Sequence, residues 1–239
     1  LEFEAGKVVE DLNLRDRLGL RRDYVVPSLT LVRADGTTLY TTRDIAYTLW
    51  KFERAEKCIN VIGMEQSLAQ MQLKIALYAL GYAEQAENLV HFAYNLVTLP
   101  GYKMSSRRGR YITLDEVMEE AVSRAYEEVS KRSPQLPEEE KRKVAEFVGI
   151  GAVRYALMEV DPSKPVEFNW ERVINFERNS APYIQYTHAR ACSIMRKASR
   201  KPESPNYGLL KEKLENEIVF ALAEFPEIFV EAADFLKPN

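Results

Sequence analysis

The sequence predicts a mixed fold in which an α/β half, a partial Rossmann-like parallel sheet, is followed by an all-α helical bundle. Apolar runs of strand length alternate with helix-period segments up to about residue 112, and only helix-period segments and proline breaks follow. Of the 239 residues, 46% are hydrophobic and 29% are charged, which is typical of a globular protein rather than a disordered one. This length fits one large domain or two smaller ones.

Charge and hydropathy exclude several classes of protein. The net charge of −3 creates no overall field that attracts nucleic acid, although a local basic face is still compatible with RNA. No apolar run approaches the roughly 20 residues of a membrane span, and Leu1 to Glu4 show neither a signal peptide nor an initiator Met. We therefore expect a cytoplasmic protein with no membrane partner, and a chain that begins inside a longer protein.

The two cysteines give no sign of a metal site. Cys58 and Cys192 lie far apart in the sequence, with no Cys or His companions at metal-ligand spacing. We expect both thiols to be reduced and structural, because free cysteine is commonly buried. No protein-ligated metal is expected.

The first half contains the signals of a βαβ unit. Residues 1–20 are weakly periodic and support no prediction, whereas residues 24–27, 29–32 and 37–40 resemble short strands. Asp35-Gly36 tolerates positive φ, so a β-hairpin is expected there. The next expected elements are a helix over 44–54, a strand over 58–62 that ends at Gly63, a helix over 68–79 that Gly81 stops, and a strand over 89–97.

The strand-helix-strand order implies a parallel sheet, and open sheets of this kind bind ligands beyond the carboxyl ends of their strands. A basic stretch bracketed by glycines, residues 101–110, directly follows the last of these strands. We expect it to be a loop at the functional site.

The second half is expected to be helical. Thr113 and Glu116 form a T-x-x-E capping box, and Pro137 followed by three glutamates is a favourable first turn. The first helix should bury Leu114, Val117, Met118, Ala121, Ala125 and Val129, and the second Val144, Phe147, Val148, Gly151 and Tyr155.

After a break at residues 161–165, we expect one helix over 170–199 that bends at Pro182, and a final pair over 210–222 and 226–236. No strand is expected beyond residue 113. The predicted domains are residues 1–112, a Rossmann-like half, followed by two helical regions, residues 113–168 and 169–239.

Several segments, in one order and at compatible spacing, resemble class I arginyl-tRNA synthetases of archaeal type. Tyr40-Thr41-Thr42-Arg43-Asp44-Ile45-Ala46-Tyr47 resembles the family's Y-x-T-R-D-[IL]-A segment, and Gly63-Met64-Glu65-Gln66 resembles the class I G-x-[DE]-Q element. Lys103-Met104-Ser105-Ser106-Arg107 is similar to the KMSKS signature, and residues 179–190 resemble the helix that leads into the anticodon-binding bundle. The resemblance covers the chain from about residue 24 onward.

The first segment suits the recognition of arginine. A guanidinium is planar with five donors, and a carboxylate with two parallel acceptors binds it best. Asp44 could be that carboxylate and Tyr40 could share the pocket, as the resemblance also implies. Alternatively, Asp44 caps the following helix and Tyr40 is a half-buried strand aromatic. Arg43 is expected to pair structurally rather than to touch substrate.

The resemblance also assigns residues near the nucleotide. Gly63 permits close backbone approach, Glu65 is expected near the ribose hydroxyls, Gln66 near the amino acid and His91 beside adenine. The alternatives are that Glu65 and Gln66 form a solvated helical turn, and that a backbone carbonyl satisfies His91.

The loop is expected to supply catalysis. Negative charge develops on the phosphates during amino acid activation, so preorganised cations on a mobile loop are needed. Lys103, Arg107 and Arg108 suit this role, and Met104 is expected beside ATP. Ser105, Ser106 and the glycines supply small size and backbone donors. Ser106 stands where the signature has its second lysine, whose work would fall to Arg107, Arg108 or a basic group elsewhere. The alternative is a basic surface turn with no ligand.

The helix in residues 179–199 mixes aromatic, amide and cationic side chains that suit RNA: Tyr183, Gln185, Tyr186, His188, Arg190, Arg196 and Lys197. We expect Arg190, Arg196 and Lys197 to contact the RNA backbone. Packing between helices is the alternative for Tyr183, Tyr186 and Arg190, because they are spaced i, i+3 and i+7.

The resemblance implies an arginine–tRNA ligase that forms arginyl-adenylate from arginine and ATP, with Mg²⁺ carried by ATP, and transfers arginine to tRNA(Arg). We expect a monomer whose activation step needs bound tRNA. Neither His91 nor His188 stands in a HIGH-type motif, so this polypeptide alone is expected to be inactive. The alternatives are a noncatalytic tRNA-binding or scaffold protein and a cysteinyl-type relative; the segment 40–47 and the lack of zinc-ligand spacing argue against the latter.

Overall fold

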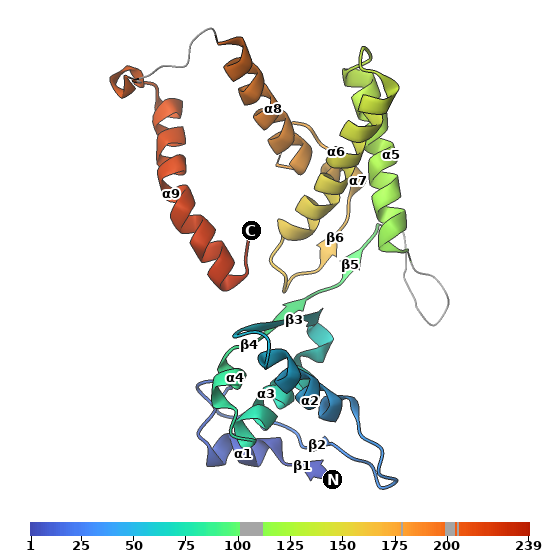
Figure 1. The fold of residues 1–239 in the computed structure, drawn as a ribbon, viewed down its shortest axis with the longest axis vertical. Coiled ribbons are helices and arrows are strands. Elements are labelled where there is room, and N and C mark those ends of the chain that lie inside the picture. The colour runs from blue at the N-terminus through green and yellow to red at the C-terminus, as the bar shows by residue number, and fades with distance from the viewer. Residues whose placement is uncertain (101–111, 178, 199–203, 205) are drawn as a thin grey trace. The chain divides into compact units, whose positions relative to one another are not determined.

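The computed structural model describes residues 1–100, 112–177, 179–198, 204 and 206–239, and it divides into two compact units, Leu1–Asn95 and Leu96–Asn239. The first unit contains β1 (Glu2–Phe3), α1 (Ala5–Asp11), β2 (Leu29–Thr30), α2 (Tyr40–Phe52), β3 (Cys58–Gly63), α3 (Ser67–Ala79), α4 (Ala83–Glu87) and β4 (Leu89–Tyr94) (Figure 1). The second contains β5 (Val97–Thr98), α5 (Leu114–Arg132), α6 (Glu138–Met158), β6 (Val166–Glu167), α7 (Trp170–Val173), α8 (Ala181–Lys197) and α9 (Lys213–Phe235). The predicted order, α/β followed by all-α, is confirmed.

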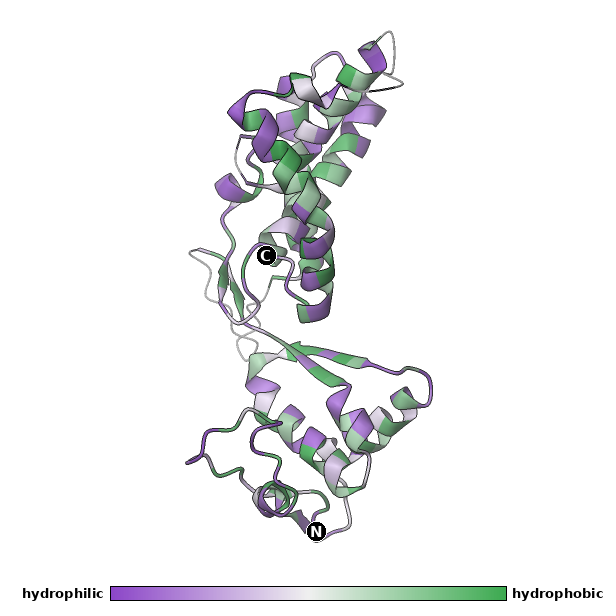
Figure 2. Ribbon diagram, turned by 90° about the vertical axis from the view of Figure 1, so that its left-hand side faces the viewer, coloured by the Kyte–Doolittle hydropathy of each residue, from purple (hydrophilic) through white to green (hydrophobic). Residues whose placement is uncertain are grey.

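A parallel pair of strands organises the first unit. β3 and β4 run in register from Cys58 opposite Leu89 to Gly63 opposite Tyr94, with α3 and α4 in the connection between them. This is the predicted βαβ unit. Helices α2, α3 and α4 lie on one side of the two strands in both Figure 1 and Figure 2, and Figure 2 shows apolar residues along both strands.

Burial along β3 follows from this one-sided cover. The side chain of Cys58 is 6% exposed, whereas those of Ile59 and Val61 are 42% and 63% exposed. The helical face of the sheet packs on α3, whose Leu73, Ile75 and Leu77 are almost fully buried. α3 ends where predicted, because Gly81 adopts a φ of +86° that few other residues tolerate.

The predicted hairpin is reduced to one bridge. Gly36 has a φ of +82°, the side chain of Asp35 accepts hydrogen bonds from Thr37, and Val32 pairs with Thr38. Residues 24–27 and 37–40 are not strands, so those predictions were wrong. β2 pairs instead with β1 in an antiparallel arrangement, because the N-terminal residues, for which no structure was predicted, supply the partner strand.

A polar cluster joins α3 to α4 and to the loop that precedes β2. Glu87 Oε1 accepts hydrogen bonds from Tyr78 Oη at 2.5 Å and from Arg17 NH1 at 3.1 Å. Burial, and then the hydrogen bond to Glu87, raises the pKa of Tyr78 to about 12. The hydrogen bond from Tyr78 lowers the pKa of Glu87, although burial of that carboxylate opposes the change.

The second unit is built on the packed helices α5 and α6. In the sequence these helices lie between two short strands, β5 and β6. The capping box is present: Thr113 Oγ1 accepts from Glu116 N at 3.2 Å, and Thr113 N donates to Glu116 Oε2 at 2.7 Å. β5 and β6 pair in parallel, with Val97 opposite Val166. The expectation of no strand beyond residue 113 was wrong, because a two-residue strand has too little sequence to show a period.

Small residues form the interface between α5 and α6. Ala121 and Ala125 of α5 are fully buried, and α6 buries Ala145, Val148, Gly149, Ala152, Val153 and Ala156. The predicted stripe of α6 was wrong by one position: Val148 is buried, but Val144 and Phe147 are 39% and 74% exposed. Small side chains let the two helices approach closely, so the larger apolar residues lie beside the interface rather than in it.

Two other helical predictions also fail. The single helix expected over 170–199 is α7 followed by α8, because Ser180 caps α8 and Pro182 lies in its first turn, where its missing N–H costs nothing. The final pair is the single helix α9, which continues through Pro226. No helix within the described residues is long and apolar enough to cross a membrane.

Adding one methyl group should distinguish two glycines of α6. A Cβ at Gly149 would lie 2.7 Å from Val122 N and 2.8 Å from Ala121 C, which are backbone atoms of α5, whereas a Cβ at Gly151 would meet the flexible amide of Gln185. We expect Gly149→Ala to lower the free energy of unfolding by about 1–3 kcal/mol, although alanine favours helices. Gly151→Ala is the control and should be neutral or stabilising in urea unfolding. Equal effects would contradict this packing.

Acid should remove the contribution of Glu87 to stability. Its pKa is lowered in the folded state, so its stabilisation is present above the unfolded pKa and is lost as pH falls through the folded pKa. Glu87→Gln keeps an acceptor for Tyr78 but loses the charge, and should cost about 1 kcal/mol at pH 7. Urea unfolding at pH 7 and pH 3 should show the difference between wild type and variant shrinking in acid; a constant difference would contradict the assignment.

Candidate functional site

Helix α2 places Tyr40 and Asp44 one turn apart. The helix begins at Tyr40 rather than at the predicted Asp44, after the extended residue Leu39. Residues i and i+4 are neighbours on a helix face, and both side chains are exposed, that of Tyr40 by 83%. Asp44 lies in the second turn, so it does not cap the helix, and Tyr40 is not a strand residue. Both alternative roles are therefore excluded.

The N-terminal end of α2 is fixed to the preceding loop. Leu31 O accepts hydrogen bonds from Leu39 N at 3.0 Å and from Thr42 Oγ1 at 2.7 Å. Arg43 Nε donates to Thr38 Oγ1 at 3.4 Å, which is a structural contact of the kind expected for this residue, made with a hydroxyl. These bonds set where the first turn of α2 begins.

The carboxyl end of β3 leads into a 3₁₀ turn, Met64–Gln66, and then into α3. Gly63 is buried, and a Cβ at this position would overlap the carboxylate of Glu65. A larger residue at this position would displace the side chain of Glu65. Glu65 and Gln66 are exposed. Their contacts with ribose and amino acid stay predictions.

His91 lies in β4, opposite Asn60 of β3. Its Nε2 is 3.1 Å from Ile62 O, and since a carbonyl only accepts, Nε2 holds the proton in this geometry. This contact is the backbone-satisfied arrangement that the sequence left open. The contact of His91 with adenine stays a prediction.

A small hollow adjoins His91. Its volume is about 220 Å³, and its lining includes Ser67, Gln70 and Lys74 of α3 together with Arg17. The charge of Arg17 is offset by Glu87, which accepts a hydrogen bond from it. With Arg17 paired in this way, Lys74 is the other cation in the lining of this polar hollow.

Sequence reasoning missed a hydrogen-bonded chain across three elements. Lys51 Nζ donates to Asn60 Oδ1 at 2.6 Å, and Asn60 Nδ2 donates to Gln70 Oε1 at 2.7 Å. Gln70 is 8% exposed, and the other two residues are partly buried. Asn60 could have been noticed, because it is the one strongly polar residue in the apolar run Cys58–Gly63.

The predicted catalytic loop lies outside the described residues. This applies to Lys103, Met104, Ser105, Ser106, Arg107 and Arg108. Their roles stay predictions, as does the alternative of a basic turn without a ligand.

The predicted RNA-binding residues lie on α8. Arg190, Arg196 and Lys197 are exposed, and Arg190 NH1 donates to Tyr186 Oη at 3.3 Å. Tyr183 and Tyr186 are 42% and 53% exposed, so packing between helices does not account for them within the described chain. Ala181 and Gln185 face α6 instead, beside Gly151.

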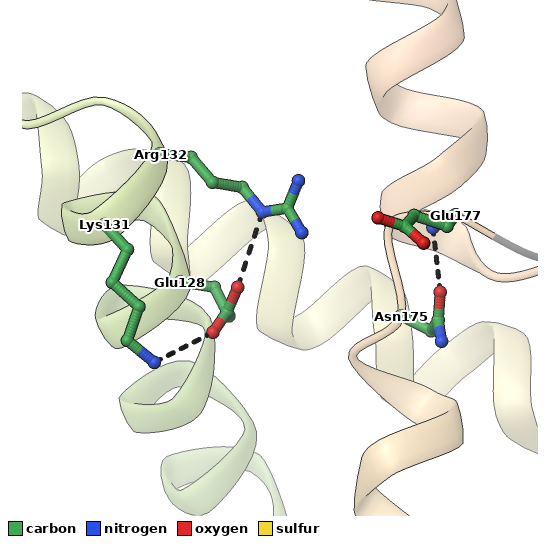
Figure 3. Close-up of polar contacts among 5 residues, drawn as sticks. All are labelled: Glu128, Lys131, Arg132, Asn175 and Glu177. Carbon is green, nitrogen blue, oxygen red and sulfur yellow. Dashed lines mark hydrogen bonds and ion pairs between the residues drawn. The ribbon is translucent and has the colours of Figure 1, made fainter.

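The cations at the end of α5, Lys131 and Arg132, form ion pairs with a carboxylate. Figure 3 shows Glu128 bonded to Lys131 Nζ at 3.0 Å and to Arg132 Nε at 3.4 Å, and nearby Asn175 Oδ1 accepts from Glu177 N at 2.8 Å. The hydrogen bond from Lys131 is the main reason that the pKa of Glu128 is lowered. The ion pairs among the described residues include none of Arg190, Arg196 and Lys197, so no carboxylate pairs with these three cations there.

The cysteines are free thiols, Cys58 buried and Cys192 partly exposed. Cys192 Sγ lies 3.5 Å from Nε2 of His188, four residues earlier on α8. In the part of the chain that the structure describes, no group of three or more His, Cys, Asp and Glu side chains could hold a metal ion.

Comparison with known families finds two matches. The model for the catalytic domain of class I tRNA synthetases (R) matches residues 21–170, and the model for the DALR anticodon binding domain matches residues 184–239.

Among curated relatives, the arginine–tRNA ligase of Ignicoccus hospitalis is 50% identical over 245 residues, covering 100% of this chain and 39% of the relative. The arginine–tRNA ligase of Pyrobaculum islandicum is 46% identical over 240 residues, covering 99% of this chain and 37% of the relative. The chain thus spans well under half the length of these relatives.

Solved structures give the same fold. The arginyl-tRNA synthetase of Thermus thermophilus superposes with a TM-score of 0.81 at 29% identity, covering 98% of this chain and 47% of that one. The arginyl-tRNA synthetase of Plasmodium falciparum superposes with a TM-score of 0.73 at 17% identity, covering 95% of this chain and 41% of that one, which is evidence of fold alone.

Proposed function

The chain belongs to the class I arginyl-tRNA synthetase family, and from this we propose that it forms the arginine-recognising part of an arginine–tRNA ligase. Members of class I use ATP. In the proposed reaction, the carboxylate of arginine attacks the α-phosphorus of ATP and releases pyrophosphate. The arginyl group then passes from the adenylate to tRNA(Arg), and AMP leaves. The observation that carries the proposal is the placement of Tyr40 and Asp44 one turn apart on the exposed face of α2.

Recognition of the guanidinium follows from these two side chains. The carboxylate of Asp44 offers two acceptors to two parallel N–H groups, and the phenolic oxygen of Tyr40 offers a third. Lysine presents a single ammonium and cannot make the bidentate pair. A site built in this way would discriminate strongly against lysine, because binding lysine would leave acceptors unpaired.

The nucleotide is proposed to bind beyond the carboxyl ends of β3 and β4. Glu65 would accept hydrogen bonds from the ribose hydroxyls, Gln66 would contact the amino acid, and His91 would lie beside adenine. Gly63 supports this arrangement, since its lack of a Cβ leaves room for Glu65 to fold against the backbone.

The chemical step needs cations at the phosphates. Lys103 and Arg107, with Arg108, are proposed to stabilise the charge that develops on the α-phosphate and pyrophosphate. Ser105 and Ser106 would donate to phosphate oxygens, Met104 would lie beside ATP, and Mg²⁺ would arrive with ATP.

Binding of tRNA is proposed for the later part of the chain. Arg190, Arg196 and Lys197 would contact the RNA backbone, with residues 113–168 as a stem-contact region and 169–239 as the start of the anticodon-binding domain. Residues 1–112 are the proposed catalytic half. We propose that the enzyme acts as a monomer, and the inactivity of these 239 residues alone stays a prediction.

Replacing the carboxylate should weaken arginine binding specifically. In the full-length protein, Asp44→Asn should raise the KM for arginine by about 100-fold, because it removes a charge-assisted bidentate pair. The KM for ATP should stay within about twofold, since Asp44 makes no proposed contact with ATP. Arginine-dependent ATP–pyrophosphate exchange with tRNA present measures both constants.

The matched control is Glu53→Gln, which removes an exposed carboxylate at the other end of the same helix and should change neither constant. An unchanged KM for arginine in Asp44→Asn would disprove the proposed pocket. Binding of tRNA without any arginine-dependent exchange by the wild type would favour the noncatalytic scaffold instead.

A further inference from the structure

The face of α2 that bears Tyr40 and Asp44 extends to Lys51. At 100° per residue, Tyr40, Asp44, Tyr47 and Lys51 are spaced i, i+4, i+7 and i+11, and so form one stripe along the helix. Lys51 Nζ lies 5.1 Å from the centre of the Tyr47 ring, in agreement with this spacing. The proposed arginine ligands and Lys51 therefore turn together when the helix turns about its axis.

Directional bonds hold Lys51 in place. Its Nζ donates to Asn60 of β3 at 2.6 Å, and Asn60 in turn donates to Gln70 of α3 at 2.7 Å. Because Gln70 is only 8% exposed and lies in a packed helix, it gives this series of hydrogen bonds a rigid end. The bonds thus tie the stripe on α2 to both elements that flank the proposed nucleotide site.

The buried face of α2 gives weaker control over rotation. It buries Thr41 and Thr48 and packs Ile45, Leu49 and Phe52 against the core. Apolar contacts are non-directional and tolerate small rotations, whereas a hydrogen bond weakens steeply with angle. Tyr40 and Asp44 are exposed, so the orientation of the helix determines where they point.

We propose that Lys51 and Asn60, with Gln70 behind them, are positioning residues for the arginine-binding face of α2. The inference rests on the proposed function, because it deepens the account of the same site. The Lys51–Asn60 bond fixes the rotation of α2, and with it the distance from Asp44 to the residues after Gly63. The role proposed for Lys51 and Asn60 is to hold α2, not to contact substrate.

A positioning role and a purely structural role predict different kinetics. Misplacement of the arginine ligands alone raises the KM for arginine and leaves the KM for ATP unchanged. General loosening of the fold lowers the melting temperature and the active fraction, which lowers kcat without selecting one substrate. The comparison between substrates is therefore the informative readout.

The experiment uses the full-length protein and arginine-dependent ATP–pyrophosphate exchange with tRNA present. Lys51→Met should raise the KM for arginine about tenfold, with the KM for ATP within about twofold. Lys51→Arg keeps a cationic donor and should restore the wild-type KM. Lys57→Met is the matched control, because Lys57 is an exposed lysine six residues further along the chain, and it should change neither constant.

A second variant keeps the test independent of the folding of Lys51→Met. Asn60→Ser removes the amide oxygen that accepts from Lys51 and leaves a small polar side chain in its place. This variant should reproduce the selective rise in the KM for arginine. The double variant should be no worse than Asn60→Ser alone, because Asn60→Ser already breaks the bond to Lys51 as well as the bond to Gln70. Additive effects would overturn the proposal.

Other outcomes are equally decisive. If Lys51→Met behaves like Lys57→Met, or if the two KM values rise together, Lys51 is not a positioning residue while the proposed function stands. If the wild type shows no arginine-dependent exchange at all, the proposed function fails and this inference fails with it.

Discussion

The orientation of α2 on the layer formed by β3 and α3 is the constraint on which the rest of the site depends. The two proposed arginine ligands project from this helix into solvent, and no packing of their own fixes them. Their geometry therefore comes from the bonds at both ends of the helix, Thr42 to Leu31 at the first turn and Lys51 to Asn60 at the last. Polar anchors suit this task because they fix direction, whereas the apolar core beneath α2 mainly contributes stability.

Local signals predicted the elements that depend on local physics. The apolar strand ending at Gly63, the helix stopped by Gly81 and the capping box of Thr113 were all predicted correctly, because a turn, a left-handed residue and a cap are properties of a few neighbouring residues. The rest depends on partners distant in sequence. β2 pairs with N-terminal residues, and β6 is only two residues long.

The buried face of α6 shows why apolar patterns can mislead. Sequence reasoning followed the larger residues Val144 and Phe147, but the interface with α5 consists mainly of alanine and glycine one position further on. Close approach of two backbones favours small residues, so size was a poor guide to burial. Proline was also over-interpreted: Pro182 starts a helix and Pro226 interrupts none.

The candidate site was predictable in part. The spacing of Tyr40 and Asp44 was apparent in the sequence, and an earlier helix start than expected places them one turn apart. The hydrogen bonds that link Lys51, Asn60 and Gln70 were not apparent, because they join three elements whose packing the sequence does not show. The sequence also did not show which cations form ion pairs. In the structure, Lys131 and Arg132 pair with Glu128, whereas the cations of α8 are exposed.

The most direct test is a crystal structure of the full-length protein with arginine and a nonhydrolysable ATP analogue. The account predicts two guanidinium nitrogens about 2.7–2.9 Å from the carboxylate oxygens of Asp44, with the phenol of Tyr40 in contact and the Lys51–Asn60 bond intact. A guanidinium bound away from Asp44 and Tyr40 would contradict it.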